Sequence, residues 1–101
     1  MASKKEYLDY ILEQLSGLDD VSYRKMMGEY IIYYKNRIIG GIYDDRFLVK
    51  PTDSAKRLMP EAVSELPYEG AKPMLLVENT DDRDFLCELL NVLADELPPR
   101  K

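Results

Sequence analysis

Histidine and tryptophan do not occur in the 101-residue sequence, and cysteine occurs once, as Cys87. Without histidine, the chain lacks the side chain most often used for general acid–base catalysis near neutral pH and for binding transition metals. One cysteine cannot form an intrachain disulfide, and with no histidine to activate it Cys87 is predicted to be a structural thiol. We therefore expect no enzyme, no catalytic residue, no metal site and no cofactor.

Long hydrophobic runs are also lacking. In the opening stretch MASKKEYLDYILEQL, charged residues interrupt the apolar ones, whereas a secretory signal needs about 7–15 consecutive apolar residues and a membrane span about 20. The absence of a disulfide framework favours a reducing compartment. The sequence therefore predicts a soluble, cytoplasmic protein with no membrane partner.

Positive charge is scarce and unevenly distributed. The chain has 14 basic and 19 acidic residues, a net charge of −5. Residues 24–50 hold six basic and three acidic residues, hence +3, and the other 8 basic and 16 acidic residues give −8. Basic side chains on strand edges usually discourage aggregation, which is the simpler interpretation. The other interpretation is a mildly basic contact surface.

Two amphipathic helices are predicted, one near each end of the chain. Ser3 and Glu6 match the S-x-x-E capping box, and apolar residues at spacings of three and four then predict a helix over about residues 4–16. Thr80 is predicted to cap the last helix, which has acidic residues in its first turn and a leucine-rich stripe. Both apolar stripes require a surface to cover them.

Between these helices, β-branched and aromatic residues favour strands. The predicted strands are residues 21–26, 29–35, 38–43, 46–50 and 74–78. The connections at Asn36–Arg37 and Asp44–Asp45 are too short for a parallel crossover, so the first four strands are predicted to form an antiparallel meander. Short helical turns are expected near residues 53–59 and 60–65.

The predicted fold class is α+β, with an antiparallel β-meander sheet and the N- and C-terminal helices packed on one face, in one domain over residues 1–101. Gly40 and Gly41 lie inside a predicted strand, which indicates a bulge or close packing within the protein, and otherwise the approach of a ligand. Five of the eight tyrosines lie on predicted strands. They are either covered by the chain's own helices or open to a partner or a nucleic-acid base.

The strand-rich segment also resembles a known family. Arg24-x-Met26-Met27-Gly28, the tyrosine-rich EYIIYYK, the Gly40–Gly41 pair and the strand FLVK are similar to the N-terminal domain of the TfoX/Sxy family, with Met27 where Phe is frequent. The order of elements resembles that domain along essentially the whole chain. The resemblance implies a stand-alone TfoX N-terminal-like domain over residues 1–101 and a link to the regulation of competence genes. Full-length regulators of that family carry a further helical domain.

The main hypothesis is a non-enzymatic protein-interaction module with a regulatory role. Its expected partner is a protein, for which a transcription factor is one candidate, and a homodimer is a further expectation. The alternative is direct nucleic-acid binding through the basic, tyrosine-bearing segment 24–50. A third hypothesis is a small-ligand pocket whose floor is Gly28 with the Gly40–Gly41 pair. The predicted partner-binding residues are Arg24, Met27, Gly28, Lys35, Arg37, Arg46 and Lys50.

Overall fold

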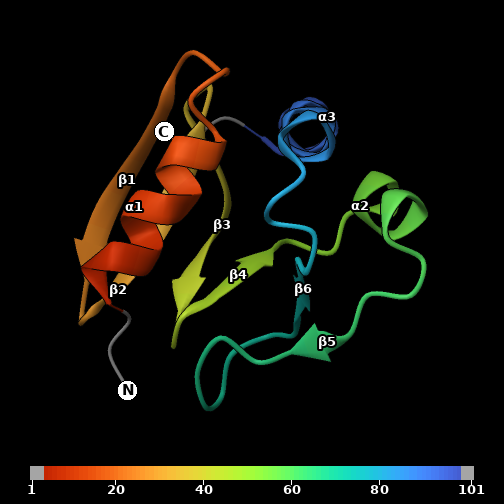
Figure 1. Ribbon diagram of the computed structural model, residues 1–101. Coiled ribbons are helices and arrows are strands. Elements are labelled where there is room, and N and C mark those ends of the chain that lie inside the picture. Colours follow the sequence, from red (N-terminus) through yellow and green to blue (C-terminus); the bar gives the residue numbers. More distant parts are fainter. Residues whose placement is uncertain (1–3, 99–101) are drawn as a thin grey trace.

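The computed structural model describes residues 4–98, which form three helices and six strands (Figure 1). The helices are α1 (Lys5–Gln14), α2 (Asp53–Leu58) and α3 (Arg83–Glu96). The strands are β1 (Val21–Met26), β2 (Glu29–Tyr34), β3 (Arg37–Tyr43), β4 (Arg46–Val49), β5 (Ser64–Glu65) and β6 (Met74–Leu76). All neighbouring strands are antiparallel, in the order β1-β2-β3-β4-β6-β5. The α+β prediction is confirmed.

Both terminal helices pack on the same face of the sheet, which we call the inner face. Leu8 and Ile11 of α1 and Leu89 and Leu93 of α3 are fully buried in one cluster, together with inward-facing residues of β2, β3, β4 and β6. Fully burying an aliphatic side chain contributes about 1.5–3 kcal/mol relative to leaving it exposed. The two apolar stripes therefore hold the helices against the sheet, and α1 lies across β1 and β2 (Figure 1).

Three two-residue turns connect the first four strands. Met27–Gly28, Lys35–Asn36 and Asp44–Asp45 all have positive φ angles at both positions, as type I′ turns do, and this turn type matches the twist of the strands that it joins. The turn predicted at Asn36–Arg37 is wrong by one residue, because Arg37 already pairs with Tyr34 as the first residue of β3.

A β-bulge interrupts the pairing of β2 with β3. Ile32 pairs with Gly40, whereas its neighbour Tyr33 pairs with Ile38, so Ile39 is the extra residue. A bulge bends its strand and increases the local twist. The bulge predicted from the glycine pair is confirmed.

Close approach of the backbone explains why this strand carries glycine. A Cβ atom on Gly40 would lie 2.1 Å from the backbone oxygen of Leu48 in β4. One on Gly41 would lie 2.5 Å from the backbone oxygen of Tyr30 in β2. The space beside both glycines is filled by the protein's own strands, as the intramolecular packing interpretation predicts.

The segment between β4 and β6 differs from its prediction. Residues 60–65 were expected to form a helical turn, but Ser64 and Glu65 form β5 and pair with Leu75 and Met74 of β6. A strand of two residues shows no alternation of apolar and polar positions, so its sequence carries no strand pattern.

The caps of the long helices also differ from their predictions. Asp82, not Thr80, caps α3, because its Oδ1 accepts the amide hydrogen of Phe85 over 3.0 Å. The predicted capping box begins at Ser3, which lies outside the described residues. Lys4 occupies the N-cap of α1 and makes no side-chain cap bond. Its amide donates instead to Oδ1 of Asp45 in the β3–β4 turn, over 2.8 Å.

Candidate interaction surface

The predicted partner-binding residues do not form one patch. They divide between the two ends of the sheet, which a strand of six residues separates by roughly 20 Å. Met27, Gly28 and Arg46 lie at the end with the β1–β2 turn, Lys35, Arg37 and Lys50 lie toward the opposite end, and Arg24 lies in the middle of β1. No small ligand can therefore touch all seven.

Arg46 has an internal role. Its guanidinium forms an ion pair with Glu65 of β5 and donates hydrogen bonds to the carbonyl oxygens of Tyr43, over 3.1 Å, and Leu66, over 3.3 Å. These contacts tie β4 to β5 and to Leu66, the residue that follows it. Arg46 is therefore mainly a structural residue.

Arg37 is also engaged within the chain. Its Nε donates to the carbonyl oxygen of Leu97, and its Nη1 to that of Lys35, both over 2.9 Å. Arg37 thereby links β3 to the residue after α3. Lys50 is only partly exposed at the end of β4.

Three of the predicted residues are accessible. Arg24 and Lys35 are exposed, and the Lys35 ammonium lies 5.3 Å from the ring centroid of Tyr34. Met27 is 96% exposed, the largest fraction among the large hydrophobic side chains of residues 4–98. Gly28 shares its turn and has a φ of 85°. The predicted site is thus reduced to β1 and the two turns that flank β2.

β1 is an edge strand, a position that is not among the predictions made from the sequence. In the described part of the chain it pairs with β2 alone, and every residue from Ser22 to Met27 is exposed. Along an antiparallel ladder, residue pairs that are hydrogen-bonded to each other alternate with pairs that are not. Met26 and Glu29 flank the two-residue turn and therefore form a hydrogen-bonded pair. The amide of Lys35 donates to the carbonyl of Asp20, which fits the same alternation. The residues whose backbone groups point away from β2 are therefore Val21, Tyr23 and Lys25.

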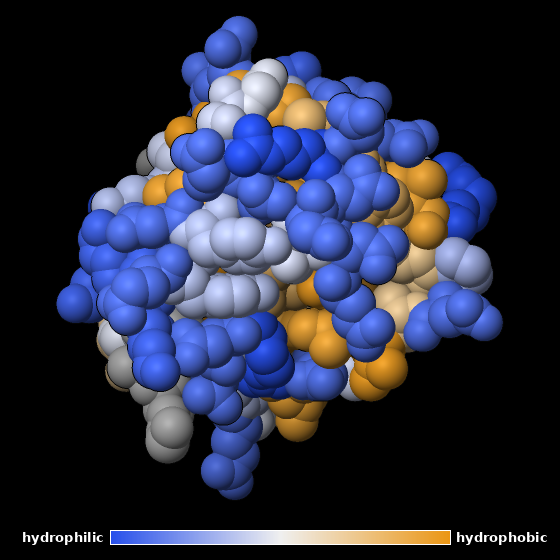
Figure 2. All heavy atoms as spheres, in the orientation of Figure 1, coloured by the Kyte–Doolittle hydropathy of each residue, from blue (hydrophilic) through white to orange (hydrophobic). Residues whose placement is uncertain are grey.

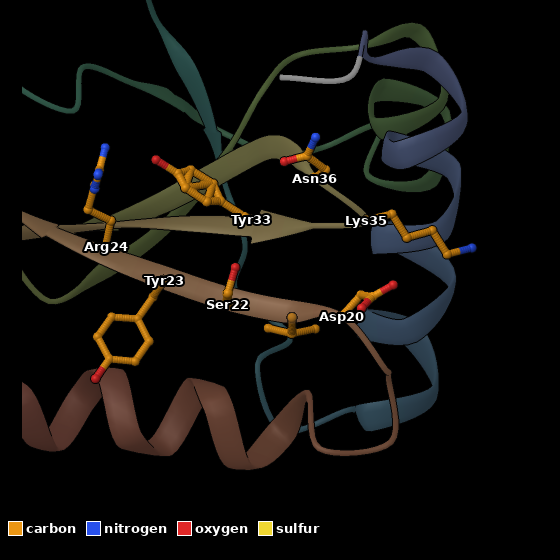
Figure 3. Close-up of a pocket in the computed structure, with 8 residues that line it drawn as sticks. Asp20, Ser22, Tyr23, Arg24, Tyr33, Lys35 and Asn36 are labelled. Carbon is orange, nitrogen blue, oxygen red and sulfur yellow. The ribbon is translucent and has the colours of Figure 1, made fainter. Parts of the chain in front are cut away.

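Two hollows flank this edge, one on each face of the sheet. The outer hollow, on the face away from the helices, measures about 690 Å³ and is lined by residues 20–24 together with Tyr33, Lys35 and Asn36. Figure 3 shows Ser22, Arg24 and Tyr33 on the side of the sheet away from α1, and Tyr23 on the side of α1. The inner hollow measures about 470 Å³ and lies between the end of α1 and β1. Its lining residues are Leu12, Leu15, Ser16, Leu18, Val21, Ser22 and Tyr23.

The strand tyrosines are mostly covered. Tyr30 and Tyr34 are 5% and 4% exposed within the core under the helices, and the Tyr34 hydroxyl donates to Oδ1 of Asn91 over 2.8 Å. Tyr33 faces the outer hollow but is 8% exposed, whereas Tyr23 is 44% exposed. The prediction that the chain's own helices cover the strand tyrosines is thus confirmed for Tyr30 and Tyr34.

Exposed hydrophobic side chains also lie at the other edge of the sheet. Figure 2 shows hydrophobic atoms gathered around β5 and β6, where Val63 and Leu66 are 52% and 48% exposed. Nearby, burial and the neighbouring Tyr68 raise the pKa of Tyr43 above its ordinary value. A strand of two residues offers little backbone for pairing, so this edge is poorly suited to strand addition.

Residues 4–98 offer neither a cluster of metal ligands nor a helix of membrane-spanning length. This part of the chain holds no cluster of three or more cysteine, aspartate or glutamate side chains that could bind a metal ion, and Cys87 is half-buried. No helix within it has the length and apolar character needed to cross a bilayer.

Comparison with known proteins gives the family. The family model of the TfoX N-terminal domain matches residues 13–84. An uncharacterized 12.7 kDa protein in the trpE 5′ region of Spirochaeta aurantia is 30% identical over 105 residues, in an alignment covering 100% of this chain and 91% of that protein. No solved structure matches the chain. The match spans most of the sequence, including β1 to β6, and the chain belongs to the TfoX N-terminal domain family.

Proposed function

We propose that the chain is a non-enzymatic protein-interaction module with a regulatory role, and that its partner binds along β1 and the β1–β2 turn. The observation that carries this proposal is the open edge of β1, with exposed side chains from Ser22 to Met27. Proteins usually shorten, cover, bend or charge such edges, because an open strand is a template for another chain. β1 is six residues long and uncovered, and its charged residues, Arg24 and Lys25, are both basic. An apolar side chain as exposed as Met27 adds contact area for a partner.

The family supports the regulatory part of the proposal. The TfoX N-terminal domain family is linked to competence regulation, so a transcription factor is the candidate partner and the cytoplasm the proposed location. A second copy of the chain is the other partner to test, since an edge strand can pair with its own equivalent.

A charge-reversal experiment tests the proposal. Arg24→Glu combined with Lys35→Glu changes two exposed residues beside β1, and Lys56→Glu combined with Lys72→Glu is a matched control on exposed residues elsewhere. Each double variant changes the net charge of −5 by −4, to −9. We expect quantitative affinity capture from a cell lysate to lose specific proteins with the first variant and keep them with the control. Equal capture by the wild type and both variants, with unchanged circular dichroism, contradicts the proposal.

Direct nucleic-acid binding is the second candidate, because Arg24 and Lys35 line one hollow together with Tyr33. The small exposed fraction of the Tyr33 ring leaves little surface for stacking a base. This function requires affinity for an oligonucleotide that falls steeply between low and moderate salt. Fluorescence anisotropy with labelled single- and double-stranded DNA measures it, and no binding at low salt rules it out.

A further inference from the structure

The open edge of β1 has side-chain sites on both faces. In an added strand, successive side chains point to opposite faces of the sheet, and residues directly opposite each other share a face. Side chains opposite Tyr23 would therefore lie on the inner face, beside the hollow that includes Leu12 and Leu18. Side chains opposite Ser22 and Arg24 would lie on the outer face, beside the outer hollow. The two hollows thus match the alternation of one extended segment.

The charges along this edge favour an acidic strand of another protein over a second copy of this chain. β1 carries Arg24 and Lys25 and no acidic residue, and Lys35 lines the outer hollow. Two β1 strands paired with each other would bring four cations together in two adjacent strands, which disfavours a second copy of this chain. An acidic strand would place its carboxylates opposite Arg24 instead. Asp20 lies at the far end of the same hollow, where it would repel an acidic side chain of the partner. The favourable position for such a side chain is therefore near Arg24.

We infer that β1 accepts an extended segment of the partner protein as a seventh strand, in which acidic residues facing Arg24 alternate with apolar residues facing the inner hollow. This inference rests on the proposed interaction function and specifies the chemistry of the partner. Backbone hydrogen bonds to Val21, Tyr23 and Lys25 supply affinity, and the two hollows supply specificity, as in other cases of strand addition.

Synthetic peptides test the chemistry directly. The probe is a nine-residue capped peptide in which Glu alternates with Val, and the controls are a Lys–Val alternation and a peptide with the composition of the probe but its Glu residues contiguous. We expect the Glu–Val peptide to bind about tenfold more tightly than the Lys–Val peptide, because a few exposed charge pairs differ in total by about 1.4 kcal/mol. Binding is measured from amide shifts of the full-length ¹⁵N-labelled protein, with slowed hydrogen exchange expected at Tyr23 and Lys25.

Two variants separate strand addition from other contacts. Tyr23→Pro removes an amide that points away from β2, so it blocks an added strand while leaving the β1–β2 ladder bonds, and Tyr23→Thr is the control that keeps the amide. We expect Tyr23→Pro to abolish binding of the Glu–Val peptide and Tyr23→Thr to retain it. Arg24→Glu leaves the backbone unchanged and is expected to reverse the preference toward the Lys–Val peptide. This variant decides the question if the proline variant does not fold.

The outcomes separate this inference from the function on which it rests. Binding of neither peptide, equal binding of both, or amide shifts confined to other strands overturns strand addition. A dimer that forms without peptide and is lost on Tyr23→Pro shows that the occupant is a second copy, which also overturns it. If the peptides fail but the Arg24 and Lys35 double variant still loses captured proteins, the interaction function stands without strand addition. If capture is unchanged, the interaction function itself fails.

Discussion

Gly40→Ala tests the close approach of β3 and β4. The added Cβ would lie 2.1 Å from the backbone oxygen of Leu48 and 2.7 Å from the Cα atom of Val49. Both are backbone atoms, so no side-chain rotation relieves the clash and β4 must shift. Overpacking typically costs 1–3 kcal/mol, and a shift of β4 also disturbs its pairing with β6. We expect the free energy of unfolding to fall by about 3 kcal/mol, which lowers Tm by roughly 12–24 °C in a domain of this size.

Two other glycines provide controls for this prediction. A Cβ on Gly17 would meet only Sγ of Cys87 at 3.9 Å, so Gly17→Ala is expected to be neutral or to stabilise by up to about 1 kcal/mol. A Cβ on Gly70 would meet nothing within 4 Å, but its φ of +86° makes Gly70→Ala destabilising by about 1–2 kcal/mol. Urea unfolding followed by circular dichroism measures all three variants. A Gly40→Ala loss below about 1 kcal/mol, or an equal loss for Gly17→Ala, refutes the reasoning.

Three further predictions concern caps, turns and pH. Asp82→Ala removes the acceptor of the Phe85 amide and should lower the free energy of unfolding by about 1 kcal/mol in urea titrations. Met27→Asn creates the Asn-Gly pair preferred in type I′ turns, so it should raise Tm while weakening partner capture. The Ser54 amide donates to the Glu96 carboxylate over 2.9 Å, which lowers the pKa of Glu96 below 4.5. The folded state therefore binds this proton less tightly than the unfolded state, and the stability that results is present above pH 4.5 and lost as the pH falls below it. Glu96→Gln should flatten that part of the stability–pH curve, and an unchanged slope contradicts the assignment.

The parts of the fold that the sequence predicted are those with local signals. The helix periodicity, the β-branched and aromatic strand composition and the very short connections each act within a few residues, so α1, α3 and the β1–β4 meander were correctly predicted. The missed features depend on contacts distant in sequence. β5 exists because β6 pairs with it, and the turn at Lys35–Asn36 is set by the pairing of Tyr34 with Arg37.

The candidate surface was predicted only in part, for a similar reason. The residue type shows that a side chain is cationic, but it does not show which acceptor within the protein the side chain contacts. Arg37 and Arg46 were therefore predicted to bind a partner, whereas their guanidinium groups contact backbone carbonyl oxygens and, for Arg46, Glu65. The edge position of β1 follows from the order of all six strands, which no single segment encodes. One local signal was available: VSYRKM carries polar residues on both faces, a pattern typical of an edge strand.

The placement of β6 between β4 and β5 divides the sheet into two parts with different routes of assembly. The strands β1 to β4 meet through turns of two residues, whereas β6 reaches β4 only after the chain closes a loop over residues 50–73. Closing a loop of this length in an unfolded chain costs roughly 2 kcal/mol more than closing a two-residue turn. We therefore expect the flank that carries β5 and β6 to form last and to open first, so that its amides exchange with solvent while the amides that β1 and β2 donate to each other remain protected.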